Sequence, residues 1–313
     1  MDRSSGLELA NDNAARHWLA MAGIQGWETR TGPGYTAVRC EGDPGDSHRV
    51  VLTRRPADPV ALSRELLTLF RDWETGSLCL EDPYAALDLS GHGCERALPM
   101  AVMVRPPGPV PERGPGTGVV RAAGERGGPA SGAAVRAGGP GGTAVEAVEA
   151  VEAAKTAAGS SAAFEAAAEA AVGPVVEVFQ ARTEEDLAAA ERVVVEGFPM
   201  PARMPLRRGR MFPASLDALE GRRLWLARRG GEPAGGCVSW DDGAAVGIYW
   251  VAVLERHRSY GVARAVLTEA LRAHPDRAAT LTATLLGEPL YRRLGFVEQG
   301  VTTWWRYPGT VVR

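Results

Sequence analysis

The chain has 313 residues, of which 45% are hydrophobic, and a formal net charge of -3. That length allows a sizeable core and suggests two domains, and the near-neutral charge argues against a nucleic-acid partner, because nucleic-acid-binding proteins usually carry a positive surplus. The four cysteines are scattered without paired spacing, so neither a disulfide framework nor a metal site is expected. The N-terminus lacks a basic segment followed by an apolar one, and no run reaches the ~18 apolar residues of a membrane span, which favours a cytoplasmic protein without a membrane partner.

Residues 1–105 are predicted to form a small α+β unit. In "NDNAARHWLAMAGI" (11–24) an asparagine of capping type precedes apolar residues at helical spacing, so a helix is expected there. Strands are expected at "GYTAVRC" (34–40), "HRVVLTRR" (48–55), "SLCLEDPYAALDL" (77–89) and "PMAVMVRP" (99–106). "DPVALSRELLTLFRDW" (58–73) is typical of an amphipathic helix, with Asp58 as its N-cap and Pro59 in its first turn.

Residues 106–173 are rich in Gly, Pro and Ala and nearly free of aromatic residues. Such a composition does not bury enough apolar area to offset the entropy of ordering, so we predict a disordered linker. From Ala144 onward the segment is rich in Ala and Glu, which favours partial helix without a packed partner.

Residues 174–313 carry a sharper pattern. A strand at "PVVEVFQA" (174–181) precedes a helix at "TEEDLAAAERVVVEGF" (183–198), whose Thr183 and Asp186 fit a variant of the capping box. "MPLRRGRMF" (204–212) is predicted to be an arginine-rich loop. Three short β-like runs follow at residues 222–231, 232–243 and 244–255, each closed by Gly, Pro or Asp, as in an antiparallel meander. "RAATLTATLL" (277–286) is a further strand candidate.

The turn after the third of these runs is the most informative stretch. "LERHRSYG" (254–261) leads into "GVARAVLTEALRA" (261–273), where apolar residues share one helical face. The first turn of a helix offers unpaired N–H groups and the positive end of the dipole, which attract anions. Gly261 permits close approach of the backbone, Ala263 leaves room above it, and Arg258 adds a positive charge suited to phosphate. The turn therefore indicates a pyrophosphate site, with an ordinary helix start as the alternative.

"VAVLERHRSYGVA" (251–263) together with "PLYRRLGF" (289–296) resembles the two signature motifs of the GNAT superfamily of acyl-CoA-dependent N-acetyltransferases. The resemblance covers about residues 174–306 and implies an α/β (α+β) fold whose mixed sheet is splayed, with acyl-CoA in the gap. It also implies a cofactor site formed by Val251, Ala252, Val253, Arg258, Ser259, Tyr260, Gly261, Val262 and Ala263. In it, backbone groups at Val251 and Val253 would hold the pantetheine and polarise the acetyl carbonyl, and residues 258–263 would hold the pyrophosphate.

The resemblance places Tyr291 near the thioester sulfur, where a phenol that stays neutral at pH 7 suits protonation of the leaving thiolate. A packed structural tyrosine is the alternative. Glu196 is the candidate general base, while a water chain and three other carboxylates stay open as alternatives: Asp241, Asp242 and Glu288. Tyr249 and Trp250 are expected either to line the acceptor pocket or to belong to the strand core.

The chain also departs from the family pattern. Leu254 or Glu255 stands where a proline is usual, Ser259 replaces a glycine of the turn, and Thr284 lies where an asparagine is common. These departures bear on the pantetheine contacts and the water network.

Residues 1–105 resemble, more weakly, the degenerate N-terminal half of tandem GNAT proteins. This half lacks the phosphate-binding turn, so we predict that it does not bind CoA and instead walls the acceptor pocket or supports residues 174–313.

The expected function is transfer of an acetyl group from acetyl-CoA, as co-substrate, to a primary amine of a small molecule or peptide by direct attack. A catalytically silent acyl-CoA-binding or sensing module, or a scaffold, stays open as the alternative, as does a homodimer.

Overall fold

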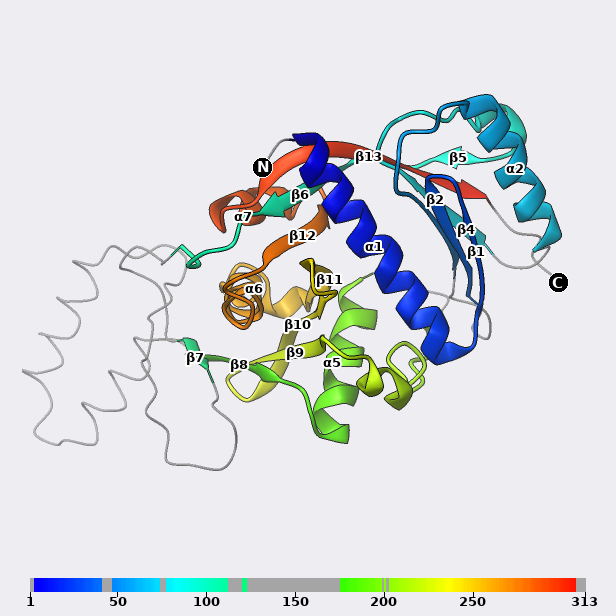
Figure 1. Ribbon diagram of the computed structural model, residues 1–313. Coiled ribbons are helices and arrows are strands. Elements are labelled where there is room, and N and C mark those ends of the chain that lie inside the picture. Colours follow the sequence, from blue (N-terminus) through cyan, green and yellow to red (C-terminus); the bar gives the residue numbers. More distant parts are fainter. Residues whose placement is uncertain are drawn as a thin grey trace, which may run out of the picture.

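The structure is a computed structural model that describes residues 3–40, 47–73, 77–111, 120–122, 175–198, 200 and 203–307 (Figure 1). The elements before the predicted linker are α1 (Arg3–Gln25), β1 (Glu28–Gly32), β2 (Tyr35–Arg39), β3 (Ser47–Leu52), α2 (Pro59–Asp72), β4 (Ser77–Asp82), a 3-10 helix (Ser90–His92), β5 (Glu95–Arg96) and β6 (Met100–Arg105). Inside the predicted linker, a short strand β7 (Val120–Ala122) is present, which the Gly/Pro-rich composition does not indicate. The predicted partly helical segment from Ala144 onward lies outside the described residues.

The strands and helices predicted within residues 174–286 occur in the predicted order, and further elements follow as far as Tyr307. They are β8 (Val176–Gln180), α5 (Glu184–Gly197), a 3-10 helix (Ala214–Ala218), β9 (Arg222–Arg229), β10 (Glu232–Asp241), β11 (Ala245–Val253), a 3-10 helix (Glu255–His257), α6 (Val262–Arg272), β12 (Ala278–Ala283), α7 (Glu288–Arg293) and β13 (Val297–Tyr307). The predicted helix caps are confirmed. The Asp58 carboxylate accepts hydrogen bonds from the backbone N–H groups of Val60 and Ala61, and the Thr183 hydroxyl oxygen accepts one from the N–H of Asp186.

Two expectations in the N-terminal part are wrong in detail. The first helix begins well before Asn11, so the asparagines at 11 and 13 lie inside α1 and are buried rather than capping it. The strand expected over residues 77–89 stops at Asp82, because the Asp82 carboxylate accepts hydrogen bonds from the N–H groups of Tyr84, Ala86 and Leu87 and turns the chain away.

The described strands form one open mixed sheet in the order β1-β2-β3-β4-β13-β6-β12-β11-β10-β9-β8-β7, with β5 paired to β13. The predicted mixed α/β fold is therefore confirmed. The same arrangement occurs twice along this sheet. Three antiparallel strands, a helix and a parallel strand form β1-β2-β3-α2-β4, and they recur as β9-β10-β11-α6-β12.

The last strands of the two repeats, β4 and β12, lie near the centre of the sheet, and β13 and β6 lie between them. β6 follows β4 in sequence but pairs antiparallel with β12 on one side and β13 on the other. The far half of β13, from Thr303 to Tyr307, pairs with β4. The N-terminal residues thus supply a strand that completes the sheet around β12, and the C-terminal strand closes the sheet of the first repeat.

Helices cover both faces of the C-terminal half of the sheet. Successive residues of a strand point to opposite faces, and on β10 Cys237 lies in a core cluster with α6, while Val238 lies in another with α5. α1 runs across the strands on the α5 face and contacts strands of both repeats, among them β2, β6, β11 and β13 (Figure 1). The first helix of the chain therefore covers strands that come from both ends of the sequence.

Candidate functional site

A gap opens in the sheet between β11 and β12. The two strands pair in parallel at three positions only, from Ala245 with Ala278 to Gly247 with Thr280. Beyond these, β11 continues beside β10, and residues 281–283 pair with β6 instead. The corresponding strands of the first repeat, β3 and β4, stay paired over five positions, from Ser47 with Ser77 to Val51 with Glu81. Only the second repeat among the described strands therefore offers an opening between its parallel strands.

The strand that borders this gap carries a bulge. The register between β10 and β11 shifts between Gly236 and Val238, and Trp250, which lies in the bulge, has a φ of 56°. A positive φ in a tryptophan is strained and tends to occur at functional sites, where it redirects backbone groups. The bulge falls directly before the predicted Val251, Ala252 and Val253, so it changes the direction of their backbone groups beside the gap.

The turn that follows β11 leads into the N-terminus of α6. Its backbone is bent by left-handed residues, with φ values of 66° at Ser259 and 77° at Gly261. Gly261 takes the N-cap position, and among the described residues no side chain caps this helix. The predicted apolar face of α6 is buried, and its residues are Val262, Val266, Leu267, Ala270 and Leu271. The helix end beside the gap therefore presents backbone N–H groups that no capping side chain satisfies, as an anion site requires.

The equivalent helix of the first repeat, α2, begins differently. At the N-terminus of α2, the carboxylate of Asp58 already occupies the first N–H groups, and Pro59 has no N–H to offer. A bound anion would be repelled by that carboxylate. The two helix starts thus have opposite electrostatic character, and the prediction that residues 1–105 do not bind CoA stays a prediction.

Arginine side chains surround the turn before α6. Arg258 is exposed, and its Nε donates to the carbonyl oxygen of Val253 at 3.4 Å. The Arg229 guanidinium lies 3.6 Å from the ring centroid of Tyr260, and Arg264 donates to the carbonyl oxygen of Pro111 at 3.2 Å. These charges add to the positive end of the α6 dipole, so the turn has the electrostatic character that suits a polyanion.

Close packing holds α6 against the sheet at this point. A Cβ added to Gly235 of β10 would lie 2.5 Å from a methyl carbon of Val262 and 3.2 Å from the carbonyl oxygen of Ala252. A side chain there would push the first turn of α6 away from β11. Gly235 thus sets the distance between the turn and the bulged strand, a role that the sequence pattern did not reveal.

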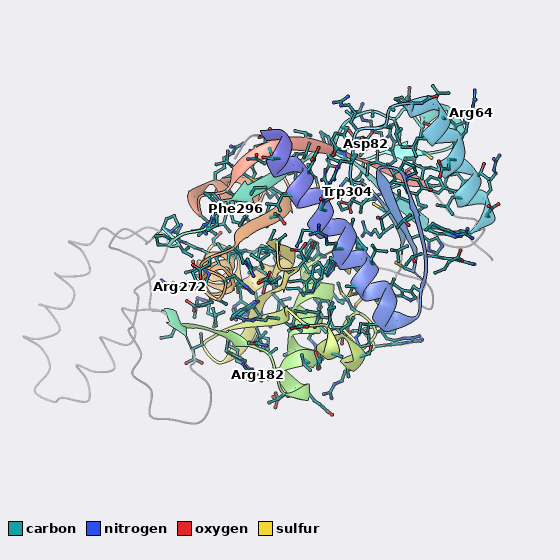
Figure 2. All side chains as sticks on the ribbon, in the orientation of Figure 1. Arg64, Asp82, Arg182, Arg272, Phe296 and Trp304 are labelled. Atoms are coloured by element: carbon teal, nitrogen blue, oxygen red, sulfur yellow. The ribbon has the colours of Figure 1, made fainter. Side chains whose placement is uncertain are left out.

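Tyr291 lies on α7, on the α6 side of the sheet. It is buried, packs edge-on against Phe296 (labelled in Figure 2) at 5.9 Å between ring centroids, and belongs to the same core cluster as Cys237. Burial raises the pKa of its hydroxyl, and the nearby Cys237 adds to this rise, so the phenol is neutral at pH 7. Within the described part of the chain its hydroxyl has no hydrogen-bond partner. Thr284 positions α7, because its carbonyl oxygen accepts hydrogen bonds from the N–H groups of Gly287 and Glu288.

The carboxylates considered for proton removal lie in different places. Glu196 sits near the end of α5, is exposed, and pairs with Arg192 at 3.8 Å. The next residue, Gly197, packs so closely on β11 that an added Cβ would lie 2.9 Å from the Cβ of Ala252. Glu196 therefore belongs to the helix end nearest the bulge.

The alternative carboxylates are engaged elsewhere. Asp241 and Asp242 occupy the β10–β11 turn, at the other end of β11 from the bulge, where they pair with Arg277 and Arg16. At about 3.3 Å per residue, this turn is roughly 25 Å from Val251. Glu288 pairs with Arg292 at 2.7 Å.

A Ser-His-Asp arrangement that the sequence did not suggest lies at that same distant end. Ser239 Oγ lies 3.4 Å from His274 Nε2, and His274 Nδ1 lies 3.6 Å from Asp241 Oδ2. Ser239, however, is fully buried, and its oxygen accepts a hydrogen bond from the indole N–H of Trp225 at 2.9 Å. No substrate reaches that oxygen, so the group links strands and helix structurally.

Residues of α1 complete the α5 face of the site, and no local pattern of residues indicates this contact. The Tyr249 hydroxyl donates to Asn13 Oδ1 at 2.6 Å, and Asn13 Nδ2 donates to the carbonyl oxygen of Ala245 at 3.2 Å. The His17 ring stacks on Tyr249 at 4.0 Å between centroids. Burial and two arginines lower the pKa of His17 to about 3, so this ring is uncharged. Tyr249 is thus held by α1 and does not belong to the strand core alone.

The loop over the end of α5 is held by a buried carboxylate. Glu191 accepts hydrogen bonds from the backbone N–H groups of Gly209 and Met211 at 2.7 Å and of Phe212 at 3.2 Å. This contact fixes the predicted arginine-rich loop beside the site. A single glutamate within a helical apolar pattern does not reveal such a partner in the sequence.

Within the described ranges, no group of three or more His, Cys, Asp or Glu side chains is placed to hold a metal ion. The helices of the described residues include none that is long and apolar enough to cross a membrane.

Comparisons with known proteins agree with this geometry. Residues 220–298 match the family described as acetyltransferase (GNAT) domain. A GCN5-related N-acetyltransferase from Kribbella flavida has a similar fold, with a TM-score of 0.52 and 16% identity over 96% of this chain and 97% of that one. A GCN5-related N-acetyltransferase from Sphaerobacter thermophilus gives a TM-score of 0.49 and 16% identity over 88% and 76% of the two chains. No curated protein matches the sequence. Residues 220–298, which contain the gap, the bulge and the turn, therefore match a GNAT acetyltransferase domain, and this match supports an acyltransferase.

Proposed function

We propose that the protein transfers an acetyl group from acetyl-CoA to a primary amine of a small molecule or peptide. The observation that carries this proposal is the uncapped N-terminus of α6 next to the gap between β11 and β12. A helix end free of a capping side chain suits a pyrophosphate, and the adjoining gap suits the extended pantetheine arm.

The donor would be bound mainly by backbone groups. Residues 258–263 would surround the pyrophosphate, with Arg258 as the side chain that adds charge. Val251, Ala252 and Val253 would pair with the pantetheine amides in place of a neighbouring strand, since β12 does not pair with them. In this arrangement the thioester lies at the bulge, where a redirected backbone N–H can stabilise the oxyanion that forms on the acetyl carbonyl.

The chemistry requires two proton transfers. The amine nitrogen attacks the acetyl carbon, the carbon–sulfur bond breaks, and the amine loses a proton as the new amide forms. We assign protonation of the leaving thiolate to Tyr291, whose phenol is neutral at pH 7 and therefore carries a proton to donate. Glu196, at the helix end next to the bulge, is the proposed proton acceptor, either directly or through water.

The first repeat would contact the amine acceptor and not the acetyl-CoA donor. Its strand order repeats that of the second, but its helix start is blocked by Asp58 and its parallel strands do not separate. We therefore assign residues 1–105 to a degenerate GNAT-like half, in which α1 forms one wall of the acceptor pocket through its contacts with Tyr249.

The Tyr291→Phe variant tests whether the protein catalyses acetyl transfer with Tyr291 as the proton donor. Thiol release from acetyl-CoA is measured with a panel of primary amines, alongside calorimetric binding of acetyl-CoA. The variant is expected to lower kcat roughly 100-fold while leaving acetyl-CoA affinity unchanged, because it removes only the proton donor. Tyr307→Phe, which alters a tyrosine packed on Phe70 in the N-terminal half, is the matched control. Binding of acetyl-CoA without thiol release from any amine would contradict the proposal and favour a silent acyl-CoA module.

A further inference from the structure

A small polar cavity lies beneath α1, where the strands of the two repeats meet. Its volume is about 30 Å³, which is room for one water-sized group. The polar residues that line it come from α1 and four strands, and they are Asn11, Glu81, Tyr249, Thr280, Thr282 and Thr302. Thr280 is also the last residue of β12 that pairs with β11, so the cavity borders the start of the gap on the α1 side.

One lining residue has an unsatisfied polar group. Thr302 of β13 is 2% exposed, and within the described residues its hydroxyl oxygen has no hydrogen-bond partner. Buried polar groups are nearly always hydrogen-bonded, so an unsatisfied hydroxyl at a cavity indicates a polar guest.

The same cavity contains a carboxylate. Glu81 of β4 faces Arg49 at 3.6 Å, a distance longer than that of a charge-assisted hydrogen bond. The Arg49 guanidinium is also held over the rings of Trp18 and Trp304, at 4.8 and 5.3 Å. Trp304 and Asp82, both labelled in Figure 2, mark this pair of strands beside α1. A carboxylate has lone pairs for several donors, so Glu81 can accept further hydrogen bonds from a guest in the cavity.

These two acceptors suit an ammonium group, which donates three hydrogen bonds and is about the size of a water molecule. Its charge would also compensate the carboxylate. Burial raises the pKa of Glu81 against the opposing effect of Arg49, so a further cation beside the group would favour its charged form.

The backbone of Glu81 lies far from the strand at which the amine is proposed to react. In the sheet, β4 is separated from β11 by β13, β6 and β12, which is four strand spacings or roughly 19 Å between backbones. The thioester is assigned to the bulge on β11. An ammonium group beside Glu81 therefore belongs to a different part of the acceptor from the nitrogen that is acetylated.

We propose that this cavity binds a second ammonium group of the acceptor, between the Glu81 carboxylate and the Thr302 hydroxyl, so that the preferred acceptor is a molecule with two separated amines. The inference rests on the proposed acetyl transfer. It assigns to the first repeat a binding residue for one end of the acceptor, while the second repeat acetylates the other end.

The test compares α,ω-diaminoalkanes of graded length with n-alkylamines of the same length, by thiol release from acetyl-CoA. The unmodified protein is expected to have at least about tenfold higher kcat/KM for the best diamine than for its matched monoamine, through a lower KM. Glu81→Gln is expected to bring the diamine to the value of the monoamine. Thr302→Val, which keeps the shape and removes the hydroxyl, is expected to reduce the preference in part. Glu95→Gln changes an exposed glutamate of the same half and is expected to keep the full preference.

Several outcomes overturn the proposal. They are equal kcat/KM for diamine and monoamine, a preference that survives Glu81→Gln, and binding of acetyl-CoA without turnover of any diamine. Should Glu81→Gln fail to fold, as its thermal transition would reveal, an unchanged preference in Thr302→Val overturns it equally. Failure of acetyl-CoA to bind the unmodified protein is a distinct result, because it removes the proposed acetyl transfer itself.

Discussion

Replacement of Glu191 tests how the loop beside the site is held. This carboxylate is 2% exposed and accepts hydrogen bonds from three backbone N–H groups of the loop, those of Gly209, Met211 and Phe212. Glu191→Ala would leave these donors without their acceptor. At about 1–2 kcal/mol for each unsatisfied group, the free energy of unfolding is expected to fall by about 3–6 kcal/mol.

Equilibrium urea denaturation followed by tryptophan fluorescence measures this change. Hydrogen exchange at Gly209, Met211 and Phe212 locates it, because these amides should lose protection first. Glu196→Ala on the same helix is the matched control. Its ion pair with Arg192 is exposed and 3.8 Å long, so its loss is expected to cost less than about 0.5 kcal/mol. A loss of less than about 1 kcal/mol in Glu191→Ala, with protection retained in the loop, would refute the reasoning.

Two further predictions concern α1 and α2. The pKa of His17 is lowered to about 3 in the folded protein, so between about pH 6.5 and pH 3 the unfolded chain binds one more proton and stability falls as the pH drops. From about pH 7 to pH 5 this costs about 2 kcal/mol, and His17→Phe, which keeps a ring on Tyr249, should lose about that much less than the unmodified protein in urea titrations. Equal losses would contradict this assignment. Asp58→Ala removes the cap of α2 and should lower the unfolding free energy by about 1 kcal/mol, whereas an unchanged urea midpoint would show that the cap contributes nothing.

Local patterns account for much of what the sequence predicted correctly. The apolar spacing of α6 and the caps Asp58 and Thr183 depend on residues within a few positions of one another, and the structure has them as expected. The turn at Gly261 is equally local, because a glycine with positive φ before a helical pattern specifies its own backbone.

Contacts between distant segments were not predictable in the same way. Asn13 has the residue type of a helix cap, yet it lies inside α1 because its partners, Ala245 and Tyr249, lie more than 200 residues away along the chain. Similarly, nothing in the residues of β6 specifies that it pairs with β12 and β13. A strand pattern indicates which side chains are buried but does not name the neighbouring strand.

The candidate site likewise has one part that depends on local sequence and one part that depends on contacts between distant segments. Its donor side is contained in one continuous stretch, residues 250–263, whose bulge and turn follow each other directly. The proposed acceptor side combines α1, β4 and β13, which come from both ends of the chain. Glu81 therefore carried no sequence signal, because its significance depends on Thr302 and on the cavity between them.

Calorimetric titration of acetyl-CoA into Gly261→Glu tests the central claim most directly. The substitution places a carboxylate at the start of α6, where the account locates the pyrophosphate. Gly243→Glu is the matched control, since Gly243 also has a positive φ, of 88°, and lies in open space at the other end of β11. The account predicts that the unmodified protein and Gly243→Glu bind acetyl-CoA with similar affinity and that Gly261→Glu does not bind it. Equal affinity in all three proteins would contradict it.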